Sequence, residues 1–218
     1  KFPIQPSKIQ AILLTHAHID HCGYLPKLVK DGFKGKIYCT AVTKEITKIA
    51  LLDSARVQEE DAAYKLRRHK KEGRKGPYPE LPLYTQEDAR AVFPYLRKVD
   101  YQKPIGLSND LIATFFEAGH ILGSAMIELK AKIGVQESVC VFSGDVGRFD
   151  KPLLNDPHSF DKADIVVMEG TYGNRVHGDG KVSLDQLADV INVTAKRGGK
   201  IIIPAFAINR TQEVMFYL

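Results

Sequence analysis

The stretch LLTHAHIDHCGYLP, residues 13–26, decides the predicted fold, because an apolar run leads directly into His16, His18, Asp20 and His21. His16 and His18 are two residues apart just past a predicted strand, so in extended backbone they point to the same side. Asp20 and His21 follow where the chain turns into a predicted helix, and they reach a second point nearby. Zinc prefers imidazole and carboxylate ligands. Two ligands at each point favour two metals over one, and the alternative is a polar loop with chance histidines.

Metal-capable residues also follow other predicted strands. His120 lies in FFEAGHILGSA, Asp145 in CVFSGDVGR and Glu169 in VVMEGTYGN, each at the end of an apolar segment. A single histidine or acid at a strand end is often structural. Four strand ends that each present such a residue toward one edge of a sheet indicate a functional site.

Short apolar segments alternate with segments of helical periodicity, which predicts an α/β fold. The expected strands are 10–15, 36–39, 111–118, 125–133, 139–143, 164–169 and 200–207. The expected helices are 23–30, 41–71, 85–93, 183–197 and 210–218. Ser183 is the expected N-cap of the fourth helix. The glycine-rich stretch GNRVHGDGK, 173–181, is expected to be a linker or a domain boundary.

The chain of 218 residues suits one domain, or one domain and part of another. Its net charge of +5 is compatible with an acidic or nucleic-acid partner. The stretch KLRRHKKEGRK, 65–75, holds seven Lys or Arg and one Glu. This stretch either tracks an RNA backbone or is the solvated face of a long helix.

Three cysteines without a CxxC pair argue against a disulfide framework and fit a reducing, cytoplasmic compartment. No apolar run is long enough to span a bilayer, and neither a signal peptide nor a membrane partner is expected. The chain begins at Lys1 rather than Met, and Leu218 lies within an apolar-periodic stretch. We therefore expect a fragment cut at both ends.

Five motifs carry a resemblance to a known family. HAHIDH (16–21) matches the HxHxDH signature of metallo-β-lactamase-fold hydrolases, and AGHILGSA and SGDVGR match the family's next histidine and bridging aspartate. MEGTYG and PAFAINRTQE (204–213) resemble motifs of the β-CASP branch, which contains RNA-processing nucleases and the mRNA 3′-end cleavage factor. The resemblance implies an α/β fold: a metallo-β-lactamase αββα sandwich over 1–172, lacking its first strands and C-terminal part, and the beginning of a β-CASP domain over 173–218.

The resemblance also implies roles for the singled-out residues. It assigns one zinc ion to His16, His18 and His120, a second to Asp20 and His21, and a bridging position to Asp145. Manganese in place of zinc is left open. The expected catalytic residues are Asp20, Asp145 and Glu169, the last orienting a histidine that protonates the leaving oxygen. Arg210 is expected to bind a substrate phosphate, with a surface salt bridge as the alternative.

Three residues of the family pattern are absent from the sequence, and two positions deviate from it: Asn209, and Gly170, where Ser or Thr is commoner. The family's first aspartate would precede position 1, and two later histidines would lie beyond Leu218. Asn209 stands where glycine is expected. Because a ligand and the proton donor are missing, these 218 residues alone are expected to be inactive.

The resemblance favours a dizinc ribonuclease that cleaves single-stranded RNA endonucleolytically, with 5′ exonuclease action as an addition. A hydrolase of a small ester, thioester or lactone on the same fold is the first alternative. A catalytically silent scaffold paralogue in an RNA-processing complex is the second, and a DNA substrate is also left open. The oligomeric state, including a homodimer, is not fixed by the sequence.

Overall fold

The computed structural model describes residues 2–176 and 180–218. The chain forms two compact units, Lys1–Met168 and Glu169–Leu218. Residues 177–179 of the expected linker lie outside the described residues. The expected division into a metallo-β-lactamase domain over 1–172 and a second domain from 173 stays a prediction.

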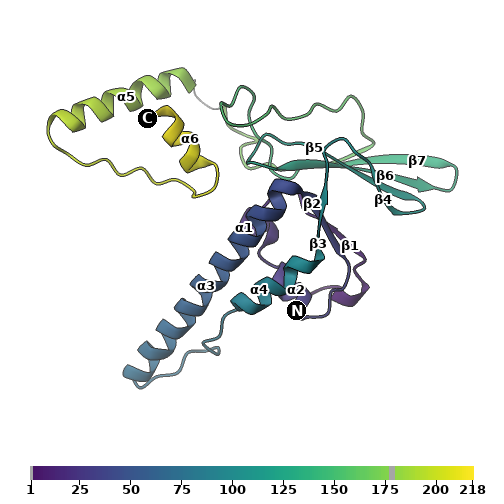
Figure 1. The fold of residues 1–218 in the computed structure, drawn as a ribbon, viewed down its shortest axis with the longest axis horizontal. Helices are drawn as coiled ribbons and strands as arrows, with labels where there is room; N and C mark the ends of the chain where they lie inside the picture. The colour runs from purple at the N-terminus through teal and green to yellow at the C-terminus, as the bar shows by residue number, and fades with distance from the viewer. Residues whose placement is uncertain (1, 177–179) are drawn as a thin grey trace. The chain divides into compact units, whose positions relative to one another are not determined.

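The first unit opens with a three-stranded parallel sheet of order β1-β2-β3, built from β1 (Ala11–Leu13), β2 (Lys36–Thr40) and β3 (Leu96–Val99) (Figure 1). The helical elements between and beside these strands are η1 (Pro6–Lys8), α1 (Ile19–Cys22), α2 (Leu25–Lys30), α3 (Ala41–Lys71), α4 (Gln86–Val92) and η2 (Phe93–Tyr95). The helix expected over 23–30 is therefore wrong in its start, because two helices meet at Gly23 and Tyr24. Pro26 explains the break, since it has no N–H to continue the hydrogen-bond ladder of α1 into α2.

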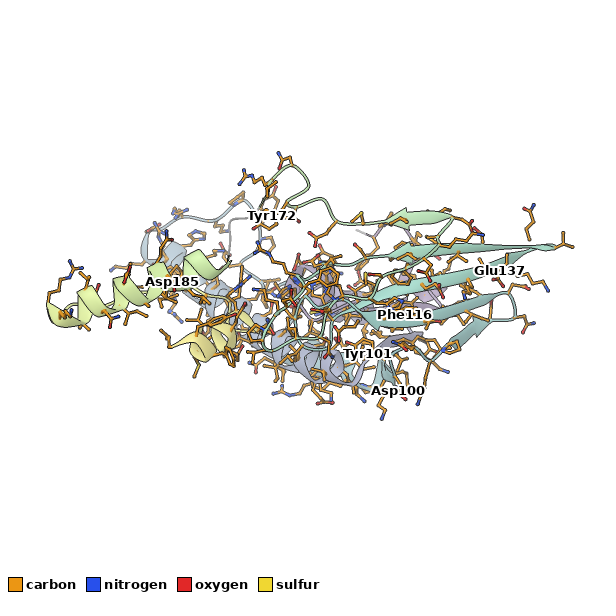
Figure 2. All side chains as sticks on the ribbon, turned by 90° about the horizontal axis from the view of Figure 1, so that it is seen from above. Asp100, Tyr101, Phe116, Glu137, Tyr172 and Asp185 are labelled. Carbon is orange, nitrogen blue, oxygen red and sulfur yellow. The ribbon has the colours of Figure 1, made fainter. Side chains whose placement is uncertain are left out.

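A mostly antiparallel five-stranded sheet follows, in the order β4-β5-β6-β7-β8. Its strands are β4 (Ile105–Ser108), β5 (Leu111–Glu117), β6 (Ala125–Ile133), β7 (Gln136–Phe142) and β8 (Ile165–Val167). Only β8 pairs with its neighbour in parallel. In Figure 2, Phe116 marks the end of this sheet where β5 leads into the loop of His120, and Glu137 lies toward the opposite end.

Two hydrophobic cores divide the first unit into layers. In one core, α2, α3 and α4 cover one face of the three-stranded sheet, with Leu28, Leu51 and Val92 packed against Ile37 and Leu96. The other core lies between the two sheets, and its side chains are Val99, Ala113, Phe115, Ala125 and Ile127, with Leu13, Tyr38 and others beside them. Helices, sheet and sheet thus form three layers, which confirms a mixed α/β fold. No helix follows β5 in the described residues up to Met168, so these residues do not form a second helical layer.

The second unit contains α5 (Gly180–Lys196) and α6 (Arg210–Tyr217). Helix α5 begins three residues before Ser183, so the expected N-cap at Ser183 is wrong, and the residue that precedes Gly180 lies outside the described part. The expected strand at 200–207 is also wrong. A strand needs a partner for its N–H and C=O groups, and the described residues of this unit include no second strand beside it. Asn209 has a φ of 66°, which explains why glycine is expected at this position.

None of the described helices combines the length and the apolar character that crossing a membrane requires.

Candidate metal centre

The backbone that follows β1 brings His16 and His18 to one end of both sheets. Leu14 N donates to Tyr38 O of β2, and Ala125 N at the start of β6 donates to Thr15 O (2.8 Å). His18 then takes the N-cap position of α1, and its carbonyl accepts from the backbone N–H groups of the first helical turn. The sequence produces this geometry because a strand ends and a helix begins within five residues.

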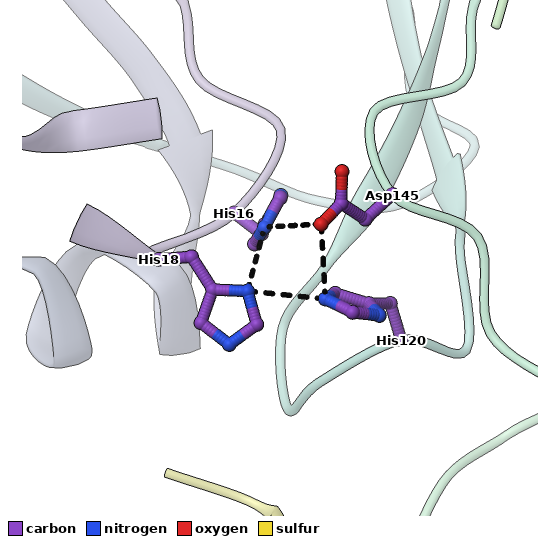
Figure 3. Close-up of side chains that lie close together, drawn as sticks. All are labelled: His16, His18, His120 and Asp145. Atoms are coloured by element: carbon purple, nitrogen blue, oxygen red, sulfur yellow. Dashed lines mark hydrogen bonds and ion pairs between the residues drawn. The ribbon is translucent and has the colours of Figure 1, made fainter. Parts of the chain in front are cut away.

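Four predicted ligands form one group in the structure: His16, His18, His120 and Asp145, whose ligand atoms all lie within 4.8 Å of one another (Figure 3). His18 Nδ1 is 3.1 Å from both His16 Nε2 and His120 Nε2. Asp145 Oδ2 is 3.6 Å from His16 Nε2 and 3.4 Å from His120 Nε2. Three imidazole nitrogens and one carboxylate oxygen that converge on one point match the donor set of a divalent metal site. The residues therefore fit a divalent metal ion.

Burial keeps the innermost histidine of the group neutral. The His16 side chain is fully buried, and desolvation, followed by the neighbouring His21, His120 and His18, lowers its pKa to about 2. Burial also lowers the pKa of His18, although Asp20 and Asp145 oppose this shift. A neutral imidazole has a free lone pair for a metal. Thr15 Oγ1 lies 3.1 Å from His16 Nδ1 and orients the ring from its other nitrogen.

His21 and Asp20 lie on the other side of the Asp145 carboxylate. His21 Nε2 is 3.3 Å from Asp145 Oδ1, whereas Asp145 Oδ2 faces His16 and His120. Asp20 Oδ2 is 3.6 Å from His21 Nε2, and its side chain is 76% exposed. Asp145 thus has one oxygen toward each set of residues, and Asp20 lies at the solvent side of the second set.

The loop that carries His120 is fixed by residues that the sequence analysis did not single out. Ser124 is fully buried, and its Oγ accepts from the backbone N–H groups of His120 (3.0 Å) and Ile121 (3.2 Å). Gly123 O accepts from the hydroxyls of Thr40 and Thr43 at the start of α3, both at 2.7 Å. The available signal was the GS pair after His120 and the two threonines that begin a helix.

Tyr101 and Glu117 also form hydrogen bonds with the loop that carries His120. Tyr101 Oη donates to Ser124 O (2.8 Å), and burial, followed by the Glu117 carboxylate, raises the pKa of this phenol. Glu117 Oε1 accepts from Gly119 N (2.9 Å) at the turn that leads to His120. His120 therefore lies on a loop whose buried polar groups are paired.

Glycines allow the Asp145 loop to approach the His120 loop at backbone contact. Gly147 N donates to Ala118 O (2.8 Å), and a Cβ at Gly147 would overlap the carbonyl oxygen of Gly119. Gly144 has a φ of 54°, and a Cβ there would lie 2.8 Å from Thr15 Cβ. Only glycine fits both positions, so the SGDVG sequence sets the distance between Asp145 and the histidines.

Glu169 and Arg210 belong to the second unit. Arg210 Nη1 donates to Glu213 Oε2 (2.8 Å), one turn along α6. The arginine side chain is 58% exposed, so the salt bridge named as the alternative is formed. Glu169 is the first residue of this unit. The catalytic role of Glu169 and the phosphate-binding role of Arg210 stay predictions.

The two-sheet fold with a His/Asp group at one end of the sheets has a counterpart among known families. The model of the metallo-beta-lactamase superfamily domain matches residues 4–140 of this chain. The chain belongs to this superfamily, as its HAHIDH motif indicated.

Two named relatives match this chain over its whole length. Ribonuclease TTHA0252 of Thermus thermophilus is 33% identical over 217 residues, which cover all of this chain and 44% of the relative. The transcription termination factor FttA of Methanosarcina mazei is 35% identical over 221 residues, all of this chain and 31% of the relative. The chain therefore spans less than half the length of these relatives. Among solved structures, a subclass B3 metallo-beta-lactamase from a soil metagenome aligns with a TM-score of 0.40 and 16% identity, over 66% of this chain and 44% of that one.

Proposed function

We propose that this chain is the metal-binding part of a hydrolase of the β-CASP branch that cleaves phosphodiester bonds of single-stranded RNA. Membership in the metallo-beta-lactamase superfamily and the group of His16, His18, His120 and Asp145 support metal-dependent hydrolysis. The names of the relatives, a ribonuclease and a transcription termination factor, support RNA as the substrate. Three free thiols support a cytoplasmic location.

The observation that carries the proposal is the position of Asp145 between two sets of ligands. Its Oδ2 faces His16, His18 and His120, and its Oδ1 faces His21. We assign a first metal to the three histidines, a second to Asp20 and His21, and a bridging role to Asp145. Two zinc ions, or manganese in their place, would supply activation of water and stabilisation of the charge on a phosphate.

The chain's own residues position and prepare this site. Burial keeps His16 unprotonated, so a proton does not compete for its lone pair at neutral pH. Asp145 neutralises positive charge between the two sets of ligands. Asp20, at the solvent side, is proposed to be a ligand of the second metal together with His21. Glu169 is proposed to orient a histidine that protonates the leaving oxygen. Arg210 is proposed to bind a substrate phosphate.

Asp145→Ala in the full-length protein tests the proposal most directly. Because the carboxylate serves both sets of ligands, we expect the bound metal to fall and cleavage of a labelled single-stranded RNA to drop by more than a hundredfold, the upper range for changes around a metal ligand. Metal content by mass spectrometry and a time course on a denaturing gel give the two readouts.

Asp100→Ala is the matched control, because Asp100 is exposed and only pairs with Lys103 on the surface. It should keep both metal and cleavage. Cleavage by Asp145→Ala at the rate of the control would contradict the assignment. A wild-type protein that hydrolyses a chromogenic ester but not RNA would favour the small-ester hydrolase, and a protein that does neither would favour the scaffold.

A further inference from the structure

The second half of α3 has no core to cover. The buried residues of this helix are Thr43, Thr47, Leu51 and Ala55, all in its first half. Residues 56–71 contain none, and Figure 1 shows this part of α3 extending past the sheet and the other helices of the unit, with the following loop running back along it. A helix that buries nothing gains little stability from packing. We call residues 56–83 the arm.

The positive charge of the whole chain is concentrated at the tip of this arm. Residues 65–75 carry a net charge of +6, whereas the chain as a whole carries +5, so the remainder is slightly negative. Lys65 pairs with Asp61, and Arg68 and Arg74 both pair with Glu72. Among the described residues, Arg67, Lys70, Lys71 and Lys75 have no ion pair.

The charge exceeds what the helix itself requires. Cations in the last turn of a helix are favourable because they face its carbonyl end, and Lys70 and Lys71 satisfy that preference. Arg67 lies one turn before Lys71, however, and such like-charge pairs cost about 0.2–0.5 kcal/mol each. Arg74 and Lys75 lie past the end of α3. The stability of the helix does not account for this cluster, and its unpaired cations are exposed and available to an anionic partner.

Hydrogen bonds hold the loop 72–83 against the end of α3, so that helix and loop together form one surface. His69 Nδ1 lies 2.5 Å from Glu80 Oε1, and Gly76 N donates to the same oxygen (3.3 Å). Leu83 N donates to Gln58 Oε1 (3.1 Å). These contacts fix the loop along α3, and between them lies a cavity of about 460 Å³.

An aromatic ring stands at this cavity beside two cations. Tyr78, Lys65 and Arg68 all line it, and Tyr78 is 81% exposed. Pro77, Pro79 and Pro82 also line the cavity, as do Asp61 and Glu80. Proteins that bind single-stranded nucleic acid combine a basic surface along the phosphates with aromatic rings on which bases stack. The tip of the arm has both elements.

We propose that the arm is a docking site for single-stranded RNA, remote from the metal centre. Arg67, Lys70, Lys71 and Lys75 neutralise phosphates, and Tyr78 stacks on a base over the cavity. From Thr43, which contacts the site loop, to Lys71 the helix is roughly 40 Å long at 1.5 Å per residue. The arm thus holds a long RNA away from the residues that cleave it. The choice of RNA rests on the proposed function, whereas the binding of a single-stranded polyanion does not.

A charge-removal variant of the full-length protein tests the arm. R67Q/K70Q/K71Q removes three exposed cations, and K34Q/K36Q/K98Q removes three exposed lysines on the three-stranded sheet and its adjoining loop. Both are made in the Asp145→Ala background, so that RNA stays intact. Fluorescence anisotropy with a labelled single-stranded RNA should show at least tenfold weaker binding for the arm variant. Its salt slope should fall by about 2, because each phosphate contact on a single strand contributes about 0.7.

Two further comparisons complete the test. Y78A should weaken binding by roughly fivefold to a hundredfold, the effect of one lost stacked base, and Y78F should restore it. An arm variant with the affinity and salt slope of the lysine control overturns the proposal, as does a Y78A protein that binds as tightly as Y78F. In that case an acidic protein surface becomes the partner to examine.

Cleavage separates this proposal from the proposed function. In the protein with Asp145 intact, the arm variant should raise KM for a long RNA without lowering kcat. It should cleave an oligonucleotide too short to reach the arm like the wild type. Loss of kcat on the short substrate overturns the docking role. If the wild type cleaves no RNA at all, the proposed function fails, and the binding measurement still decides on the arm.

Discussion

The two ends of α3 differ in the contacts that stabilise them. At its N-terminal end, Thr40 and Thr43 donate to Gly123 O at 2.7 Å, and both are buried. At its C-terminal end, helix residues pair mainly with one another and with the loop 72–83, as in the exposed pairs Lys65–Asp61 and Arg68–Glu72. Exposed pairs at this spacing contribute only a few tenths of a kcal/mol. One helix therefore connects a region that is stabilised by buried contacts to a region where exposed side chains can be replaced at little cost in stability. Substitutions in the two regions should therefore have different effects.

Gly147→Ala should have the largest effect on stability, because Gly147 lies where the backbones of the Asp145 loop and the His120 loop are in contact. The new Cβ would overlap the Gly119 carbonyl, and backbone atoms on both sides must move. We expect a loss of about 3 kcal/mol or more in the free energy of unfolding, at the upper end of overpacking. Urea unfolding followed by circular dichroism measures it, and metal affinity should fall in parallel.

Gly106→Ala is the control for this change. No atom lies within 4 Å of a Cβ there, and Gly106 does not have a positive φ. Alanine should be neutral or stabilise by up to about 1 kcal/mol. Equal midpoints for the two variants would show that the contact between the Asp145 and His120 loops is not rigid.

Ser124→Ala should have the second largest effect. It leaves the N–H groups of His120 and Ile121 without their shared acceptor in a fully buried position, which costs about 1–3 kcal/mol. Because one of these groups belongs to His120, a proposed metal ligand, metal affinity should fall more than the unfolding midpoint suggests. Isothermal titration with zinc gives the affinity.

Ser108→Ala is matched to it, since the Ser108 hydroxyl accepts from Asp110 N (3.3 Å) at an exposed turn. Water replaces that acceptor, so both stability and metal affinity should stay within error of the wild type. If Ser124→Ala also leaves zinc affinity unchanged, the loop does not position His120.

The sequence located most of the candidate site because the residues at strand ends are held by short, local backbone paths. His16 and His18 follow β1 directly, and His120 and Asp145 follow β5 and β7 within a few residues. The structure brings these four together, and their role as ligands stays a prediction. Residues that hold the loops from a distance were missed, because Thr40 and its acceptor Gly123 are 83 positions apart and meet only through the fold.

The errors in the predicted strands have a common physical cause. The strand β3, LRKV, carries two exposed basic residues and looks like a loop, yet parallel pairing with β2 stabilises it. The segment 200–207 is more apolar and looks like a strand, yet it lies beside none among the described residues of its unit. Strand formation depends on a neighbour that local sequence does not contain.

The same substitution at two positions of α3 gives the smallest and most direct comparison of its ends. Ala55 is fully buried, and Ala63 is exposed on the arm. Glycine costs about 1 kcal/mol of helix propensity at either position. At Ala55 it also removes a buried methyl group, which adds about 0.8 kcal/mol, so the urea midpoint should fall. At Ala63 the loss should stay local, because the arm can open without unfolding the core. Hydrogen exchange should then become faster only for amides of the arm, with the global midpoint unchanged. A midpoint shift for Ala63→Gly as large as that for Ala55→Gly would show that the arm unfolds together with the core, so that α3 is stabilised as one unit despite the absence of buried residues in its second half.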